Sequence, residues 1–545
     1  MQTVASVSWW AAGVLYQIYP RSFQDSNGDG IGDLRGIIDR LGYLSDLGVD
    51  AIWLSPIFPS PMADFGYDVA DYVGIDPIFG TMDDFDALVL TAHARGLKVI
   101  LDLVPNHSSD QHPWFIESRS SRDNRKRDWY IWRDPAPDGG PPTNWLSEFG
   151  GSGWEYDEAT GQYYYHAFLK QQPDLNWRNP EVRAAICEAM RFWLRKGVDG
   201  FRVDVIWHLI KDDQFRDNPP NPDFRPGMPP HAALIPQYSA DRPETQQVVA
   251  ELRSVIDEFD HRLLIGEIYL PIERLVAYYG ADLNGAQLPF NFALLSTPWH
   301  ARDIAALIDR YEQALPAGAW PNWVLGNHDR PRVASRVGPA QARVAAMLLL
   351  TLRGTPTMYY GDELGMEQVE IAPEDVQDPF EKNVPGIGVG RDGCRTPMQW
   401  DASAHAGFSD VRPWLPLAPD AIQDNAANLR ADAQSILNLY RALLRLRRQL
   451  PQLSVGDYQP LAADGDLLLY RRHHRGQSVL IALNLGSDPI SAASDAIGLD
   501  GEVLLSTMLD RAGERIGATP DLRGHEGIIV GRAPEAVPYT HLTPP

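Results

Sequence analysis

The 545-residue sequence is poor in cysteine and in positive charge. Its two cysteines, Cys187 and Cys394, exclude a disulfide framework, and Cys187 falls in a helical stretch where a buried free thiol is expected. Acidic residues outnumber Lys and Arg by 72 to 48, so the net charge is −24. Because nucleic acids and anionic membranes attract basic proteins, this deficit argues against both as partners. A neutral or cationic small molecule fits the charge better.

The apolar N-terminal stretch, residues 4–20, raises the question of a secretory signal. No positive charge precedes Arg21 and no stop-transfer segment follows, so we interpret the stretch as a buried strand. We expect a cytoplasmic protein, with a periplasmic precursor as the alternative, and a monomer or homodimer. Residues 533–545 lack apolar periodicity and are expected to form a tail outside the fold.

Short apolar segments alternate with amphipathic helical stretches along most of the chain. Eight segments have the length and composition of buried parallel strands. Eight such units favour an α/β fold of the closed (β/α)8 TIM barrel type over an open doubly wound sheet. The strand candidates are residues 14–20, 49–55, 97–106, 198–205, 262–268, 286–292, 321–327 and 355–361.

Two stretches interrupt this alternation, and a third region follows it. Residues 108–177 are rich in Trp, Tyr, Asp, Gly and Pro, and they predict a small inserted domain after the third strand. Residues 209–243 carry many prolines and predict a stiff excursion. Short strand-like segments predict a C-terminal antiparallel β domain over 451–532. The barrel is therefore assigned to residues 1–107 and 178–450.

Polar residues that end the apolar segments are the candidates for chemistry, because barrel enzymes build their sites at the carboxyl ends of the strands. Carboxylates stand at three of these ends, as Asp204, Glu267 and Asp329. A single Asp there is typical of a helix cap or an ion pair, whereas several that converge favour acid/base and nucleophilic chemistry. No Cys or His cluster of metal spacing accompanies them. The other strand-end residues are Asp102, Asn106, His107, Arg202 and His328.

Seven short motifs surround these residues. They are YQIYPRSF (16–23), DLVPNH (102–107), QPDLN (172–176), GFRVDV (200–205), IGEI (265–268), GNHD (326–329) and RTPMQW (395–400). Each motif is weak alone, but seven in this order on a barrel alternation are specific. From about Trp10 to the C-terminal β domain, the chain resembles glycoside hydrolase family thirteen, the α-amylase family, in its oligo-1,6-glucosidase and α-glucosidase branch.

The resemblance implies a retaining, exo-acting α-glucosidase that releases glucose from the non-reducing end of short α-glucosides of the maltose or isomaltose type. Asp204 would be the nucleophile, Glu267 the general acid/base, and Asp329 the carboxylate that stabilises the transition state. Such a reaction needs an ionised and a protonated carboxyl group about 5 to 5.5 Å apart. Arg202, on the same strand face as Asp204, is spaced to keep Asp204 ionised, while apolar surroundings should hold a proton on Glu267.

The resemblance also implies residues that bind the substrate. His107 and His328 would hydrogen-bond sugar hydroxyls, with a satisfied structural histidine as the alternative reading. Tyr67 would stack on the glucose ring. Asp64 and Arg395 would pair near the glucose 4-hydroxyl and close the end of the pocket, which is why attack would start at the non-reducing terminus.

The opposite side of the predicted pocket carries less specific signals. Phe149 and Phe168 would add apolar walls, with core packing as the alternative. Val205 resembles the residue found in members that cleave α-1,6 linkages. The excursion 209–243 differs from that of a typical oligo-1,6-glucosidase, and it predicts an aglycone side narrowed to disaccharides or small alcohols.

Residues 25–33, DSNGDGIGD, have the spacing of a calcium loop. Side-chain oxygens fall at loop positions one, three, five and nine, a carbonyl is available at seven, and Gly30 permits the turn at six. Position twelve is Gly36 instead of the bidentate Glu of a calcium sensor. We therefore predict a structural Ca²⁺, against the alternative of a turn without an ion, and no organic cofactor. The predicted ligands are Asp25, Asn27, Asp29, Ile31 and Asp33.

Two rival functions remain open at this point. A sucrose isomerase or a dedicated transglucosidase would use the same carboxylates but pass the glucosyl group to an acceptor, such as an alcohol, in place of water. A non-catalytic, amylase-like binding subunit would lack the catalytic carboxylates and carry a membrane span, and the sequence shows neither trait.

Overall fold

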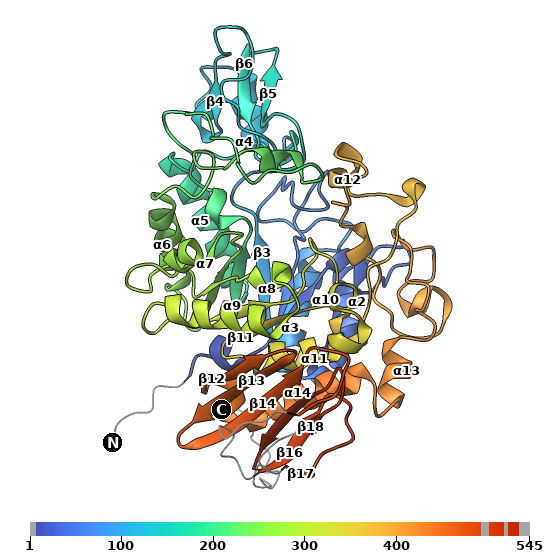
Figure 1. Ribbon diagram of the computed structural model, residues 1–545. Helices are drawn as coiled ribbons and strands as arrows, with labels where there is room; N and C mark the ends of the chain where they lie inside the picture. The colour runs from blue at the N-terminus through green and yellow to red at the C-terminus, as the bar shows by residue number, and fades with distance from the viewer. Residues whose placement is uncertain (1–6, 492–500, 517–520, 533–545) are drawn as a thin grey trace.

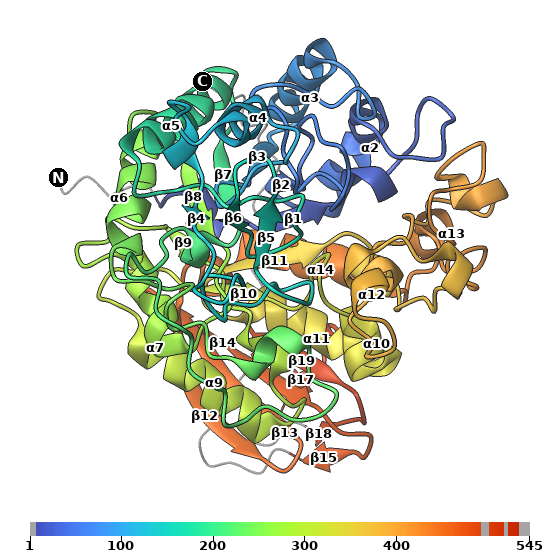
Figure 2. The same cartoon turned by 90° about the horizontal axis from the view of Figure 1, so that it is seen from above.

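The computed structural model describes residues 7–491, 501–516 and 521–532. Its centre is an eight-stranded parallel sheet in which the first strand pairs with both the second and the last, so that the sheet curves into a barrel (Figure 1, Figure 2). Each strand lies within one of the eight expected segments, and the predicted (β/α)8 barrel is confirmed. In order around the sheet the strands are β10 (Asn322–Val324), β11 (Thr355–Tyr359), β1 (Leu15–Ile18), β2 (Ala51–Leu54), β3 (Lys98–Leu103), β7 (Gly200–Val203), β8 (Leu263–Gly266) and β9 (Leu288–Pro289).

Side chains on the strands alternate between the barrel interior and the surrounding helices. Leu15, Ala51, Trp53 and Ile100 belong to one buried cluster, whereas Ile52 belongs to the larger core under the helices. The register pairs Leu15 with Ala51 and Trp53 with Ile100, so neighbouring strands fill the interior in layers. The interior is thus a packed core, and the chemistry is confined to the strand ends.

Helices enclose the barrel in an outer ring (Figure 2). Asp33 caps the first long helix by accepting a hydrogen bond from Gly36 N–H, and Thr81 and Asp84 form a capping box on the next. No helix in the described part of the chain has both the length and the apolar character that a bilayer span needs. The long helices are α2 (Leu34–Leu47), α3 (Met82–Ala94), α5 (Pro180–Arg195), α6 (Thr245–Ile256), α9 (Ala301–Ala314), α11 (Pro339–Thr351) and α14 (Ile436–Gln449).

The segment between β3 and β7 forms a small antiparallel sheet above the barrel, in the strand order β4-β6-β5 (Figure 1). Trp145, Trp154 and Tyr165 build its apolar core. This segment places a wall of aromatic side chains over the carboxyl ends of the barrel strands. Its elements are α4 (Pro113–Ser120), β4 (Trp132–Arg133), β5 (Trp154–Asp157) and β6 (Gln162–Tyr165).

The proline-rich excursion 209–243 packs against this inserted sheet. Asn144 and Asn218 exchange two hydrogen bonds, of 2.8 and 2.9 Å, and the ring of Phe215 stacks on Trp145 with centroids 5.6 Å apart. Within the excursion the chain forms the short 3-10 helix η4 (Pro230–Ala233). The excursion and the inserted sheet therefore form one continuous rim above the barrel.

The C-terminal region forms a six-stranded antiparallel sheet at the opposite end of the molecule from β4–β6 (Figure 1). Both cysteines are buried and unpaired. The tail expected at 533–545 lies outside the described residues. In sheet order the strands are β12 (Asp457–Asp464), β13 (Leu467–His474), β14 (Gln477–Asn484), β19 (Gly527–Gly531), β16 (Gly501–Ser506) and β17 (Arg515–Ile516), with β15 (Ile490–Ser491) and β18 (Asp521–Leu522) pairing separately.

A buried carboxyl group ties the first and last strands of the barrel together. Glu363, which follows β11, accepts hydrogen bonds of 2.8 Å from the hydroxyls of Tyr16 on β1 and Tyr43 on α2. Burial raises the pKa of Glu363 to about 7. No cation faces it among these contacts, so the group is easiest to accommodate when it is protonated.

We expect this carboxyl group to make the stability of the fold depend on pH. The folded state holds the Glu363 proton more tightly than the unfolded chain, in which the pKa of this carboxyl group is 4.5. The protonated group therefore stabilises the fold fully below pH 4.5, and this contribution to the free energy of unfolding is lost as the pH rises through 7. Between these limits the free energy of unfolding of the wild type should fall by about 3 kcal/mol relative to Glu363→Gln. Urea unfolding at a series of pH values measures this, and parallel curves for the two proteins would contradict it.

Candidate active site

Three carboxylates from separate strand ends line one cavity of about 600 Å³. Asp204 directly follows β7, Glu267 directly follows β8, and Asp329 lies in the loop after β10. Because parallel strands of a barrel end at the same edge, residues distant in sequence meet there. The structure thus brings the three predicted catalytic side chains together.

Beneath the cavity, the buried guanidinium of Arg202 contacts three carboxylates. Its Nη1 donates to Asp102 Oδ1 at 2.7 Å and to Asp204 Oδ1 at 2.9 Å. Its Nη2 lies 2.7 Å from Glu267 Oε2. The expected contact with Asp204 is present, but the same cation also neutralises Glu267, so Arg202 alone does not divide the roles of the two acids.

Burial and a shared cation set the ionisation of Asp204 and Glu267. Burial raises the pKa of Asp204 well above its usual value and also raises the pKa of Glu267, against the opposing charge of Arg202. The charge of Glu267 further raises the pKa of Asp204, and both acids contact the same guanidinium. These shifts favour a proton on one of the two acids, which is the state that acid-assisted displacement needs.

The residue after Asp204 is held in an unusual backbone conformation. Val205 has φ 36° and ψ 46°, a left-handed geometry that a β-branched residue rarely adopts and that costs about 1–3 kcal/mol. Its N–H donates to Glu267 Oε2 at 2.9 Å. The strained peptide therefore anchors the acid from one strand to the backbone next to the acid from the other.

Asp329 is surrounded by partners that favour its ionised form. Its Oδ1 accepts from Arg391 Nη1 at 3.2 Å and from Arg395 Nη2 at 3.0 Å, and its Oδ2 lies 3.3 Å from His328 Nε2. Although burial alone would raise the pKa of Asp329, these contacts lower it well below its usual value. Burial lowers the pKa of His328 far below its usual value, and Gln17 Nε2 donates to its Nδ1 at 2.8 Å. The neutral ring is thus assigned its proton on Nε2, toward Asp329.

An ion pair closes one end of the cavity. Arg391 Nη2 donates to Asp64 Oδ1 at 2.6 Å. The predicted partner, Arg395, instead donates to Asp329, so the prediction of an Asp64–Arg395 pair was wrong. The two arginines lie four residues apart around a short 3-10 turn, and the RTPMQW motif includes only the second of them. A local motif does not reveal which arginine side chain reaches a residue more than 300 positions away.

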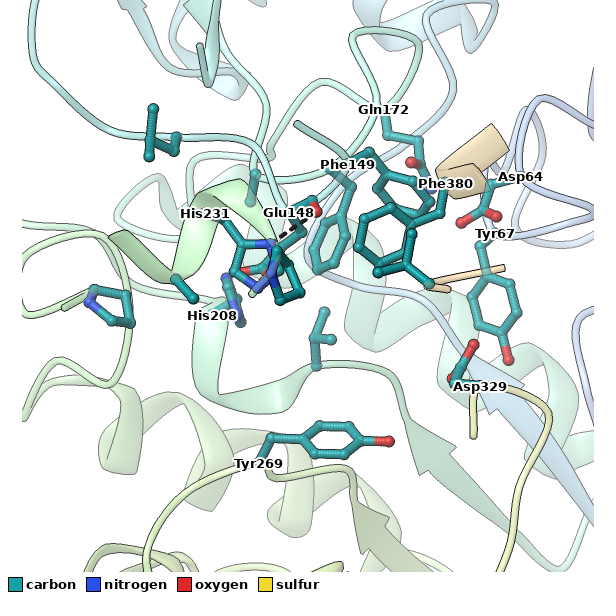
Figure 3. A pocket seen from close by; sticks show the side chains of 18 of the residues that line it. Asp64, Tyr67, Glu148, Phe149, Gln172, His208, His231, Tyr269, Asp329 and Phe380 are labelled. Carbon is teal, nitrogen blue, oxygen red and sulfur yellow. Dashed lines mark hydrogen bonds and ion pairs between the residues drawn. The ribbon is translucent and has the colours of Figure 1, made fainter. Parts of the chain in front are cut away.

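The aromatic residues named from the sequence line this cavity. Tyr67 lies beside Asp64 (Figure 3), and its hydroxyl donates to Asp102 Oδ2 at 3.1 Å. Burial lowers the pKa of His107 to about 4, so the ring is neutral and suited to hydrogen bonds with hydroxyls. Phe168 lies 5.2 Å from the His107 ring, centroid to centroid. Phe149 lines the same cavity, and the Arg391 guanidinium lies 5.1 Å from its ring centroid.

The inserted sheet and the excursion meet at the end of the cavity opposite Asp64. His231 of the excursion places Nδ1 2.9 Å from the Glu148 carbonyl oxygen and Nε2 3.0 Å from Glu148 Oε2 (Figure 3). Since Nδ1–H is committed to the carbonyl, the second contact requires another proton, either on Nε2 or on the carboxyl group. Burial raises the pKa of Glu148, against the charges of His231 and Arg330.

Sequence reasoning missed much of this second half of the cavity. Prolines identified the excursion but not which of its side chains face inward. Tyr269 and Arg330 are the nearest to a motif, since they follow IGEI and GNHD directly. The lining residues that were missed include Glu148, Gln172, Asn218, Asn221, His231, Tyr269, Arg330, Phe380 and Arg391.

The loop predicted to bind calcium is a tight turn in which Asp25 and Asp33 accept hydrogen bonds from nearby residues. Asp25 accepts N–H bonds from Asn27, Gly28 and Gly30, and Asp33 accepts from Ser26 and from the first turn of α2. The donor set, of carboxylate, amide and carbonyl oxygens, is of the type that a hard cation prefers. In the described part of the chain, however, no three His, Cys, Asp or Glu side chains are grouped as a metal site. Calcium binding by Asp25, Asn27, Asp29, Ile31 and Asp33 therefore stays a prediction.

Comparison with known proteins agrees with this geometry. Residues 17–456 match the family described as Alpha amylase, catalytic domain. A probable alpha-glucosidase of Rhizobium meliloti is 44% identical over 499 residues, which cover 88% of this chain and 90% of that protein. An oligo-1,6-glucosidase of Halalkalibacterium halodurans is 41% identical over 515 residues, which cover 88% and 91%.

Solved structures of similar proteins have the same overall fold as this chain. An alpha-glucosyl transfer enzyme superposes with a TM-score of 0.91 at 42% identity, covering 97% of this chain and 100% of the other. The trehalulose synthase of Pseudomonas mesoacidophila superposes with a TM-score of 0.88 at 35% identity, covering 96% and 100%. The chain therefore belongs to the α-amylase family, glycoside hydrolase family thirteen.

Proposed function

We propose that this glycoside hydrolase is a retaining, exo-acting α-glucosidase that releases glucose from the non-reducing end of short α-glucosides and also transfers glucose to acceptors. The observation that supports this most directly is the placement of Asp204 and Glu267 in one cavity whose end is closed by the Asp64–Arg391 ion pair. A cavity closed at one end admits a terminal sugar but not the middle of a chain. The probable alpha-glucosidase and the oligo-1,6-glucosidase among its relatives fit this reaction.

In the first step, a carboxylate oxygen of Asp204 forms a bond to the anomeric carbon as the glycosidic bond breaks. Glu267 transfers its proton to the departing oxygen, so the leaving sugar or alcohol departs neutral. Of the two acids Glu267 then carries the proton, because the approach of the positively charged anomeric carbon favours an ionised Asp204. Asp329, kept ionised by Arg391 and Arg395, faces the positive charge that develops on the sugar.

In the second step, Glu267, now ionised, takes a proton from water or from an acceptor hydroxyl. The oxygen so activated attacks the anomeric carbon and releases Asp204, which restores the α-configuration. Water produces glucose, whereas a sugar or alcohol produces a new glucoside. The two outcomes share every protein group described above and differ only in what occupies the aglycone half of the cavity.

The rim over the aglycone half supports a preference for short substrates. The excursion and the inserted sheet are joined by the His231–Glu148 contact, opposite the closed end. A long oligosaccharide must pass this rim, while a disaccharide or a small alcohol has no further units to accommodate. Whether the linkage is α-1,4 or α-1,6 depends on the aglycone orientation beside Val205.

A sucrose isomerase or dedicated transglucosidase is the second candidate, and the similarity to the trehalulose synthase and the alpha-glucosyl transfer enzyme favours it as a variation of the same chemistry. The non-catalytic alternative has little support, because Asp204, Glu267 and Asp329 are all present in one cavity.

The division of labour between the two acids is tested by a pair of variants. Asp204→Asn should lower kcat/KM for maltose by about 1,000-fold or more while the protein stays folded, because no covalent intermediate forms. Glu267→Gln should lose maltose turnover similarly but still release about one equivalent of fluoride per active site from α-glucosyl fluoride, whose leaving group needs no proton, before the second step stalls for lack of its base. Near-normal maltose hydrolysis by Asp204→Asn, with an unchanged melting temperature, would rule out this mechanism.

The exo action on short substrates is tested by product analysis with maltose, isomaltose, sucrose, trehalose and maltoheptaose, with and without an alcohol acceptor. We expect α-glucose as the first product and the highest kcat/KM for a disaccharide. Added alcohol should yield an alkyl α-glucoside at the expense of glucose. A preference for maltoheptaose, or release of β-glucose, would contradict the proposal.

We also propose that the loop 25–33 binds Ca²⁺ as a structural ion. Its support is the donor set and spacing of the loop, since Asn27 and Asp29 remain exposed to solvent. Millimolar Ca²⁺ should raise the melting temperature of the thoroughly chelated protein more than Mg²⁺ does, and Asp29→Ala should abolish that increase. The same melting temperature with chelator and with Ca²⁺ would refute this proposal.

A further inference from the structure

One cation in the cavity has no role in the reaction described above. Arg391 and Arg395 are bound to carboxylates, and Arg202 contacts three of them. Arg330 differs, because in the described part of the chain no carboxylate lies at ion-pair distance from its guanidinium, which lies 5.0 Å from the ring centroid of Tyr269. Both residues line the cavity. A cavity-lining cation without a direct ion-pair partner among these residues is a candidate for contact with a ligand.

Tyr269 holds this guanidinium in a defined place. Its ring stacks on Phe292 with centroids 4.3 Å apart and an interplanar angle of 8°. Asn327 Nδ2 donates to its hydroxyl at 3.1 Å. Arg330 lies within electrostatic reach of both Glu267 and Glu148, and Glu148 lines the end of the cavity opposite Asp64, so Arg330 is placed toward the half that would hold the leaving group. Figure 3 shows Tyr269 across the cavity from Glu148 and His231.

The charges around Arg330 define the ligand it suits. Glu267, Asp329 and Glu148 all interact electrostatically with it. An anionic ligand would be repelled by these three groups, and a second cation would be repelled by Arg330 itself. A neutral group that accepts two hydrogen bonds fits best, since the guanidinium presents parallel N–H donors in a planar fork. Adjacent hydroxyls of a sugar have this property, whereas a phenyl ring does not.

We propose that Arg330 is a specificity-determining residue that binds the hydroxyl groups of the aglycone sugar, both when it leaves and when a sugar acceptor enters. This inference rests on the proposed α-glucosidase function. It assigns to Arg330 the recognition of polyhydroxyl aglycones, while the glucose half of the cavity is recognised by the groups around Asp64 and Asp329. An aryl aglycone gains nothing from Arg330.

The test compares two substrates with the same glucose and different leaving groups, maltose and p-nitrophenyl α-glucoside. Arg330→Met should lower kcat/KM for maltose by about 10- to 100-fold, the effect of losing charge-assisted hydrogen bonds. The same variant should change kcat/KM for the aryl glucoside by less than about 3-fold. Arg330→Lys, which keeps the charge but not the planar fork, should fall between wild type and Arg330→Met with maltose.

Transfer provides a second readout. In mixtures of glucose and a simple alcohol as acceptors, Arg330→Met should shift the products from disaccharide to alkyl glucoside. Arg302→Met, at an exposed arginine outside the cavity, serves as the matched control. It should change neither the kcat/KM ratio of maltose to the aryl glucoside nor the product ratio of disaccharide to alkyl glucoside.

Three results separate the inference from the function on which it rests. If wild type releases glucose from neither substrate, the proposed function fails. If wild type is active and Arg330→Met lowers kcat/KM equally for both substrates, Arg330 acts on Glu267 or on glucose, and the inference is overturned. If neither substrate is affected, Arg330 does not contact the aglycone, and the inference is overturned as well. Competitive inhibition by glucose, unchanged in the variant, excludes a collapsed cavity.

Discussion

The balance of one buried guanidinium against several carboxylates is the constraint on which the site depends. Arg202 is fully buried and contacts Asp102, Asp204 and Glu267 within 2.9 Å. Three ionised carboxylates around one cation would leave an uncompensated charge in a medium that solvates it poorly. The site resolves this by retaining protons. Burial thus favours keeping on the site the proton that Glu267 would donate in the first step and regain in the second.

The two halves of the cavity are built by different means. The half that would hold glucose is tied together by a network of ion pairs among Asp64, Arg391, Asp329 and Arg395. The aglycone half is assembled from excursions that leave the barrel and return, and they are joined by paired hydrogen bonds, aromatic stacking and the His231–Glu148 contact. This separation allows a family to keep one sugar-binding half while varying the other, which is consistent with relatives named for hydrolysis, transfer and isomerisation.

The barrel was predictable because its strands are buried on both faces and read as continuous apolar runs. The ends of those runs also located Asp204, Glu267 and Asp329. Pairings between side chains were harder to predict from the sequence. Arg391 lies just outside a recognised motif, and whether Arg391 or Arg395 pairs with Asp64 depends on the path of a short turn. The shared role of Arg202 required knowledge that β8 lies next to β7. Glu148 and His231 carry no local pattern, since their positions depend on how two irregular segments fold against each other. Arg330 directly follows the GNHD motif, but the motif does not reveal that its side chain lies on Tyr269.

The ion pair that blocks one end of the cavity makes the opposite opening the shared route for everything that enters or leaves. In the proposed reaction a disaccharide enters with its terminal glucose first, and its second sugar departs before any other molecule reaches the glucosyl group. Water, an alcohol or another sugar then enters through the same opening, and glucose leaves through it last. Substrate, leaving group and acceptor therefore use the opening one after another. A sugar or alcohol that occupies the opening slows hydrolysis because it excludes water, although the acids themselves are unchanged.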